Sequence, residues 1–127
     1  MSFFAWGNRS VESTTTGLTS NPTTSALLAE VDLNATNATV PSGGQCWGVT
    51  WIIGNGTTNA TFLLDHALST GVASTGIRNQ TVVPMSSGAS AQFYTKHTAE
   101  PGDRFRVRVA STFTGGVAAK IIAEPLI

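Results

Sequence analysis

The chain has 127 residues, a length that supports one domain. Seven Lys and Arg residues balance seven Asp and Glu residues, so the formal net charge is zero, and charged residues make up only 11% of the chain. Proteins that bind nucleic acid through its phosphates carry a basic excess, so this composition excludes a general polyanion binder.

The first 22 residues differ from the rest of the chain. Phe3, Phe4 and Trp6 lie at the start, a polar run follows, and neither a strand period nor a helix period continues through it. We therefore predict an extended N-terminal arm over residues 1–22 and a β-sandwich domain over residues 23–127. The three aromatic side chains are expected to bind a partner subunit, because left in water they would expose a large apolar surface.

The run from Ser13 to Thr16 allows two arrangements of this arm. It pairs as an added strand on the sheet edge of a neighbouring subunit, or the arm folds back over an open end of its own sandwich.

The start of the chain has neither the basic region nor the apolar run of a signal peptide, and no stretch is apolar for long enough to span a membrane. We therefore expect synthesis in a cytoplasm.

From residue 23 onward the apolar residues alternate with polar ones, which predicts strands separated by turn signals. The expected strands are residues 27–33, 46–53, 61–68, 77–85, 91–97, 104–110 and 117–127. Asn55-Gly56 lies between the second and third of these strands and predicts a β-hairpin there. Pro84 predicts a sheet edge or a strand end, because proline cannot donate to a ladder. Glu100-Pro101-Gly102-Asp103 predicts a type II turn.

These strands, without a convincing helix, predict an all-β protein: an antiparallel β-sandwich, of which a jelly roll is one form. Trp47 and Trp51 lie on one face of their strand. They form either an aromatic platform for sugar rings or part of the core. We favour the core, because the two residues alternate in step with Val49 and Ile53.

The candidate catalytic or metal-binding residues are few. His66 and His97 are the only histidines, and Asp65 points to the opposite strand face from His66. The single cysteine, Cys46, excludes a disulfide and a zinc site built from several cysteines. No Gly-x-Ser-x-Gly elbow or phosphate-binding loop occurs. We expect structural histidines, no catalysis and no cofactor, although the dispersed acids could still meet in space: Glu30, Asp65, Glu100, Asp103 and Glu124.

Arg104, Arg106 and Arg108 hold three of the seven basic residues, and they alternate with Phe105, Val107 and Val109. The apolar residues are expected to face the core and the arginines to face outward, with no carboxylate interleaved. Such a row is stable when acids lie opposite it. Those acids belong either to a partner chain, which would make the three arginines a partner-binding row, or to neighbouring strands of the same chain. A solvated face and nucleic acid are weaker alternatives.

The chain resembles the small capsid decoration (cement) proteins of tailed bacteriophages. The resemblance rests on the polar arm Met1–Pro22, the Ser/Thr/Gly/Ala-rich and charge-poor composition, the missing signal peptide, and the stretch Glu100–Val109, which is similar to hairpins of viral β-sandwich proteins. It implies a structural virion protein on the capsid surface, made in the host cytoplasm, that binds the major capsid protein and itself as a homo-oligomer such as a trimer. It implies no enzyme activity, cofactor, nucleic acid or membrane.

Two other functions stay open. A carbohydrate- or receptor-binding β-sandwich module of a phage fibre or adhesin would expose Trp47 or Trp51. A main shell protein or minor structural virion protein would assemble by itself into closed particles.

Overall fold

The computed structural model describes residues 11–14, 19–20, 27–33, 40, 43–56, 58–69, 76–110 and 115–126. Every regular element in this part of the chain is a strand. The strands are β1 (Val11–Thr14), β2 (Thr19–Ser20), β3 (Leu27–Asp32), β4 (Gln45–Gly54), β5 (Ala60–Ala67), β6 (Ile77–Met85), β7 (Ser90–Ala99), β8 (Arg104–Val109) and β9 (Gly116–Pro125). The seven strands predicted from residue 27 onward all form, and their ends differ from the prediction by no more than two residues.

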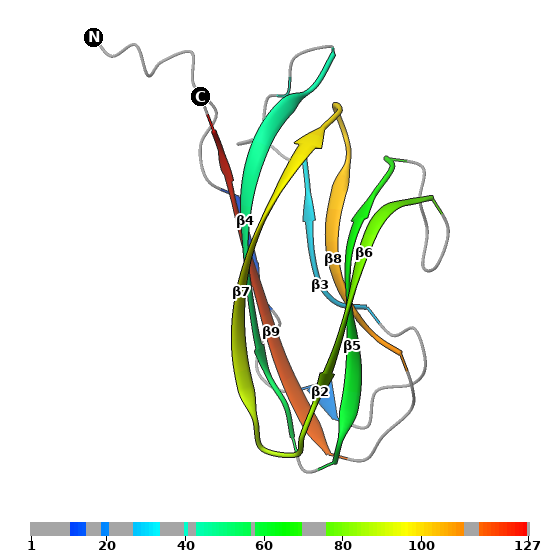
Figure 1. Cartoon of the computed structure of the whole chain (residues 1–127), viewed down its shortest axis with the longest axis vertical. Coiled ribbons are helices and arrows are strands. Elements are labelled where there is room, and N and C mark those ends of the chain that lie inside the picture. The colour runs from blue at the N-terminus through cyan, green and yellow to red at the C-terminus, as the bar shows by residue number, and fades with distance from the viewer. Residues whose placement is uncertain are drawn as a thin grey trace, which may run out of the picture.

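The strands form two antiparallel sheets that face each other (Figure 1). One sheet has the order β1-β9-β4-β7, with β2 also beside β9, and the other has the order β3-β8-β5-β6. From β2 onward, every connection except the one from β5 to β6 crosses between the sheets. This alternation defines a jelly roll. The predicted antiparallel β-sandwich is therefore confirmed.

The predicted hairpin at Asn55-Gly56 is wrong, because β4 pairs with β7 and β9 whereas β5 pairs with β6 and β8. Asn55 instead joins two loops that cross between the sheets. Its backbone N–H donates to the Ala89 carbonyl (2.8 Å), and its side-chain amide donates to the carbonyls of Thr58 (3.0 Å) and Ser86 (2.8 Å). The residues signal a turn correctly, but a turn signal does not specify which strand pairs with which.

Part of the predicted arm belongs to the larger sheet of the same chain. Ser13 lies opposite Ile121 and Thr14 lies opposite Lys120 in the β1–β9 ladder. Ser13 and Thr14 therefore follow the alternative in which the arm folds back on its own chain. Thr15 and Thr16 of the same run lie outside the described residues. The predicted partner-binding residues Phe3, Phe4 and Trp6 lie outside the described residues, and the domain boundary between residues 22 and 23 stays a prediction.

The core lies between the two sheets. Trp47 and Trp51 are 0% and 1% exposed, which confirms that they are core residues and not a sugar platform. The Trp51 indole N–H donates to Thr95 Oγ1 (2.7 Å), so this large side chain is buried with its polar atom satisfied. On one side of the sandwich β3 lies against β1 and β9. On the other side β6 and β7 are the sheet edges (Figure 1).

Two further local predictions are confirmed. Gly102 has a φ of 82° and the Asp103 N–H donates to the Glu100 carbonyl (3.1 Å), as the type II turn between β7 and β8 requires. β6, which contains Pro84, is an edge strand. No helix in the described part of the chain is long and apolar enough to cross a membrane.

Candidate functional site

The arginine row of β8 meets acids of the same chain. Phe105, Val107 and Val109 face the core and are fully buried, and the arginines occupy the opposite face of the sheet. On that face the β3 residues Glu30 and Asp32 lie opposite Arg106 and Arg104. The β5 residue Asp65 lies opposite Arg106 from the other side. Acids therefore flank the row on both neighbouring strands.

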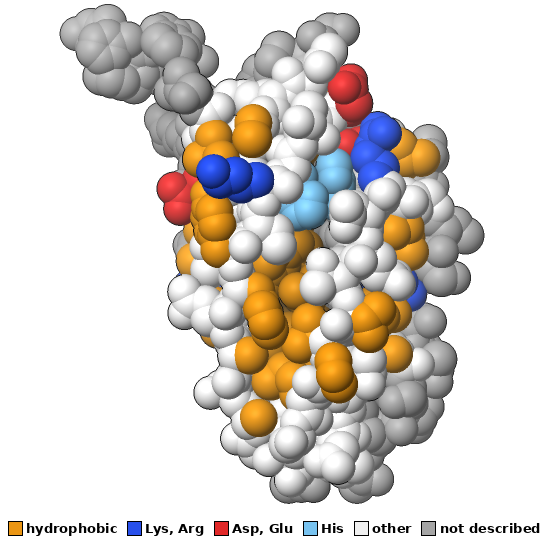
Figure 2. Space-filling view, viewed as in Figure 1, with side chains coloured by type: hydrophobic (Ala, Val, Ile, Leu, Met, Phe, Trp, Pro, Cys, Tyr) orange, Lys and Arg blue, Asp and Glu red, His pale blue; other side chains and the backbone are white. Residues whose placement is uncertain are grey.

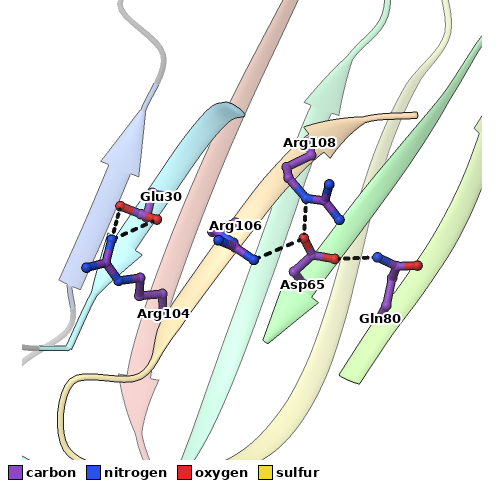
Figure 3. A network of polar contacts seen from close by, with 6 residues as sticks. All are labelled: Glu30, Asp65, Gln80, Arg104, Arg106 and Arg108. Atoms are coloured by element: carbon purple, nitrogen blue, oxygen red, sulfur yellow. Dashed lines mark hydrogen bonds and ion pairs between the residues drawn. The ribbon is translucent and has the colours of Figure 1, made fainter. Parts of the chain in front are cut away.

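Asp65 is the centre of this network (Figure 3). Its carboxylate is 0% exposed, accepts hydrogen bonds from Arg108 Nε and from Gln80 Nε2 (2.9 Å), and lies 3.8 Å from Arg106 Nη2. Burial lowers the pKa of Arg106 from its ordinary value, and the charge of Asp65 opposes that shift. The carboxylate thus compensates two guanidinium groups that lie away from water.

Arg106 and Arg108 are each 2% exposed, while Arg104 is partly exposed and donates to Glu30 Oε1 (3.3 Å). The arginines lie on the outer face of their sheet, as expected. Of the two sources of acids that the sequence left open, neighbouring strands of the same chain describe these contacts. The alternating pattern predicted which face of β8 the arginines occupy. It could not predict the acids, because they lie on β3 and β5, which are distant from β8 in the sequence. A contact of Arg104, Arg106 and Arg108 with a partner chain stays a prediction.

A second polar network holds the turn between β7 and β8. Asp103 Oδ2 accepts hydrogen bonds from His66 Nε2 (2.8 Å), from Arg78 Nε (3.0 Å) and from the Glu100 N–H (3.0 Å). His66 comes from β5 and Arg78 from β6. Because the Asp103 and His66 side chains are almost fully buried, the network connects three elements where water does not compete.

His97 of β7 faces His66 across the sandwich, with 5.0 Å between the ring centroids. Thr95 accepts the Trp51 N–H, so its own hydroxyl hydrogen can go to His97 Nε2 (2.8 Å). Burial, with a smaller contribution from the neighbouring His66, lowers the pKa of His97 to about 4. Burial also lowers the pKa of His66, although the hydrogen bond that His66 donates to Asp103 opposes this shift. Figure 2 shows the histidine side chains between the two sheets.

Both histidines have internal hydrogen-bond partners, as expected of satisfied structural residues. That they have no role beyond the structure stays a prediction. Asp65 and His66 lie on opposite faces of β5, as predicted, and each of the buried carboxylates Asp65 and Asp103 is paired with a cationic or histidine side chain. Within the described ranges no three His, Cys, Asp or Glu residues have the spacing of a metal site.

The exposed face of the larger sheet carries a feature that the sequence analysis missed. Tyr94 of β7 is 55% exposed, and a Cβ atom placed on Gly48 of β4 would collide with its hydroxyl group and ring. The tip of the Tyr94 side chain therefore lies over Gly48 of the neighbouring strand, while more than half of the side chain is exposed. A glycine inside a strand signals such a close approach, and Gly48 was the available signal.

No protein-family model and no curated protein sequence matches this chain. Solved structures share its fold at low sequence identity. A Clostridium thermocellum xylanase structure, with CBM22-1 and GH10 modules of endo-1,4-beta-D-xylanase 10B in complex with xylohexaose, matches with a TM-score of 0.55 and 15% identity over 87% of this chain. The match spans only 21% of the xylanase chain.

PRD1 vertex protein P5 also matches with a TM-score of 0.55, at 12% identity. This match covers 95% of the present chain and 99% of the vertex protein. At these identities the two likenesses establish the β-sandwich fold.

Proposed function

We propose that this protein is a structural virion protein that binds the outer surface of a phage capsid and stabilises it, as decoration proteins do. The observation that carries the proposal is the match to PRD1 vertex protein P5, which extends over 95% of this chain and 99% of that one. Jelly rolls recur in viral capsid proteins, although a fold by itself does not define a function. The partners in this proposal are the major capsid protein and further copies of the chain.

The described side chains support binding rather than turnover. Three groups that could act as acid or base make internal contacts, since Asp103 accepts a hydrogen bond from His66 and Asp65 pairs with Arg106 and Arg108. The exposed face around Tyr94 is, by contrast, accessible to a partner, and the tip of the Tyr94 side chain lies on Gly48 of β4.

Deletion of the gene from the phage genome tests the proposal. Heads should still assemble, but they should release DNA at a lower temperature than wild-type heads. Addition of the purified protein should restore the melting profile, and the protein should sediment with the heads at a fixed copy number. Heads that are equally stable without the protein, and that do not retain it when it is added, contradict the proposal.

Carbohydrate binding is the second candidate, and Tyr94 is the observation that favours it. More than half of its side chain is exposed, so the ring is accessible for stacking against a pyranose, and the xylanase chain that shares the fold was solved with xylohexaose. Titration calorimetry against oligosaccharides, with xylohexaose included, tests this function. Tyr94→Ala should abolish the binding and Tyr94→Phe should retain it. The absence of binding to every sugar tested contradicts it.

A further inference from the structure

We propose that two copies of the chain pair through their β7 strands, antiparallel and centred on Tyr94, so that their larger sheets form one continuous sheet across a two-fold axis. The surface involved is the outer edge of β7, which ends its sheet and pairs with β4 alone among the described strands. The proposal concerns the isolated protein and does not depend on attachment to a capsid.

β7 lacks the features that normally protect a sheet edge. Natural edge strands are short, bulged, charged or interrupted by proline, because an unpaired edge invites another strand. β7 keeps a continuous register with β4 from Ser90 to Ala99 and has Lys96 as its single charged residue. The β6 edge contains Pro84 and a register shift near Ile77, and β1 has only four residues.

The sequence of β7 suits pairing with itself. A two-fold axis that relates two antiparallel edges stands perpendicular to the sheet, so each outward side chain meets an outward side chain. With Tyr94 on the axis, Gln92 lies opposite Lys96 of the second copy, and Ser90 lies opposite Thr98 of the second copy. No like charges oppose each other in this register, whereas a centre at Lys96 would place two lysines together.

The position of the Tyr94 ring leaves room for the second copy at the proposed two-fold axis. Because the ring lies over Gly48 of its own sheet, it points away from the outer edge. The two copies of Tyr94 can therefore approach to the distance of an ordinary strand pair without a collision of their rings. On the core-facing row, Phe93 is only partly buried and would gain cover from Thr95 of the second copy.

Disulfide trapping tests the register. In a Cys46→Ser background, Tyr94→Cys should form a disulfide-linked dimer, because directly opposite residues have Cα atoms about 4.5–5.5 Å apart. Single variants Gln92→Cys and Lys96→Cys are the matched controls. Each is exposed, but its own copy across the axis lies about 13 Å away along the strand, so neither should cross-link. The double variant Gln92→Cys/Lys96→Cys should cross-link.

Charge substitution tests the same pairing without cysteines. Gln92→Lys places a lysine opposite Lys96 of the second copy, and the two-fold axis repeats this pair on the other side of Tyr94. The two like-charged pairs should raise the dimer dissociation constant about three- to ten-fold at low salt. Gln92→Glu should lower it, and both effects should shrink at high salt. Sedimentation velocity measures the constants. A protein that stays monomeric at about 0.1 mM, or cross-linking that is equal at residues 92, 94 and 96, would overturn the proposal.

Discussion

Asp65 shows how this fold stabilises a row of like charges. Three arginines on one strand face repel one another, yet Arg106 and Arg108 are almost fully buried, with Asp65 between them. Such a network adds little stability over well-packed apolar residues, but removal of one partner leaves an uncompensated buried charge. Loss of the Asp65 carboxylate should therefore destabilise the fold by more than the net stability that its network adds.

We expect Asp65→Ala to lower the free energy of unfolding by about 3–5 kcal/mol, because it leaves two buried guanidinium groups without their carboxylate. Urea unfolding followed by tryptophan fluorescence measures the change, since Trp47 and Trp51 are buried in the core. Asp32→Ala is the matched control. It removes a partly exposed carboxylate that lies 3.9 Å from the partly exposed Arg104 and should cost less than about 1 kcal/mol. Equal losses in the two variants would show that Asp65 does not compensate a buried charge.

The histidine pair predicts a stability that falls as the solution is acidified. The pKa of His97 is lowered to about 4 in the folded chain, against an ordinary value of 6.5, and the pKa of His66 is lowered too. Between these values the unfolded chain binds protons that the folded chain does not, so stability is greatest above pH 6.5 and declines toward pH 4. The slope is at most about 1.4 kcal/mol per pH unit for each histidine.

Melting temperatures measured between pH 7 and pH 4 check this dependence. The variant His97→Gln keeps a polar side chain near Thr95 and should show a shallower decline than the wild type, because one titrating group is gone. Carboxylates titrate in both proteins, so the difference between the two profiles isolates His97. If the two profiles are parallel, His97 is not the source of the loss of stability at low pH.

At the scale of strands and turns, most of the fold could be predicted from the sequence. Every strand from β3 to β9 was located from the sequence. In β7 and β9 the more buried residues alternate with the more exposed ones, because a strand that buries one face has a period of two. Pro84 identified an edge and Gly102 identified a type II turn, since each imposes a local backbone constraint. These signals are contained within a few residues, so no knowledge of the tertiary structure is needed to use them.

The failures concern contacts between distant segments. Asn55-Gly56 signals a turn, but whether the next strand pairs with the previous one or crosses to the other sheet depends on the whole arrangement. For the same reason Asp65 could not be assigned to Arg106 and Arg108, because their contact needs the β5–β8 register. Tyr94 and Gly48 also meet only through the β4–β7 register, although each lies in a correctly predicted strand.

The turn between β7 and β8 yields a prediction at this scale. Gly102→Ala should destabilise the chain by about 1–2 kcal/mol, because Gly102 has a φ of 82° and an alanine in a left-handed conformation is strained. Thr98→Ala, at an exposed position of the adjacent strand, is the control and should change the stability little. Thermal unfolding by circular dichroism compares the two. A variant Gly102→Ala that is as stable as Thr98→Ala would mean that the turn relaxes to another conformation.

Across the whole molecule, the two sides of the sandwich differ. On one side β1 and β9 lie against β3, so the sheets are in contact there. On the other side the edges β6 and β7 face outward, with apolar side chains at the surface between them (Figure 2). β1 therefore contributes to the closed side, while the open side has the outer edge of β7, on which we expect a second copy to bind.

Two N-terminal deletions separate the structural role of β1 from the predicted binding role of the aromatic residues. Deletion of residues 2–10 removes Phe3, Phe4 and Trp6 but keeps β1, whereas deletion of residues 2–16 also removes β1 from the edge of β9. We expect the shorter deletion to leave the melting temperature nearly unchanged and to abolish attachment to phage heads. The longer deletion should lower the melting temperature by several degrees, because each ladder hydrogen bond contributes about 0.5–1.5 kcal/mol. A large loss of stability from the shorter deletion alone would show that Phe3, Phe4 and Trp6 complete the core of their own domain and do not bind a partner.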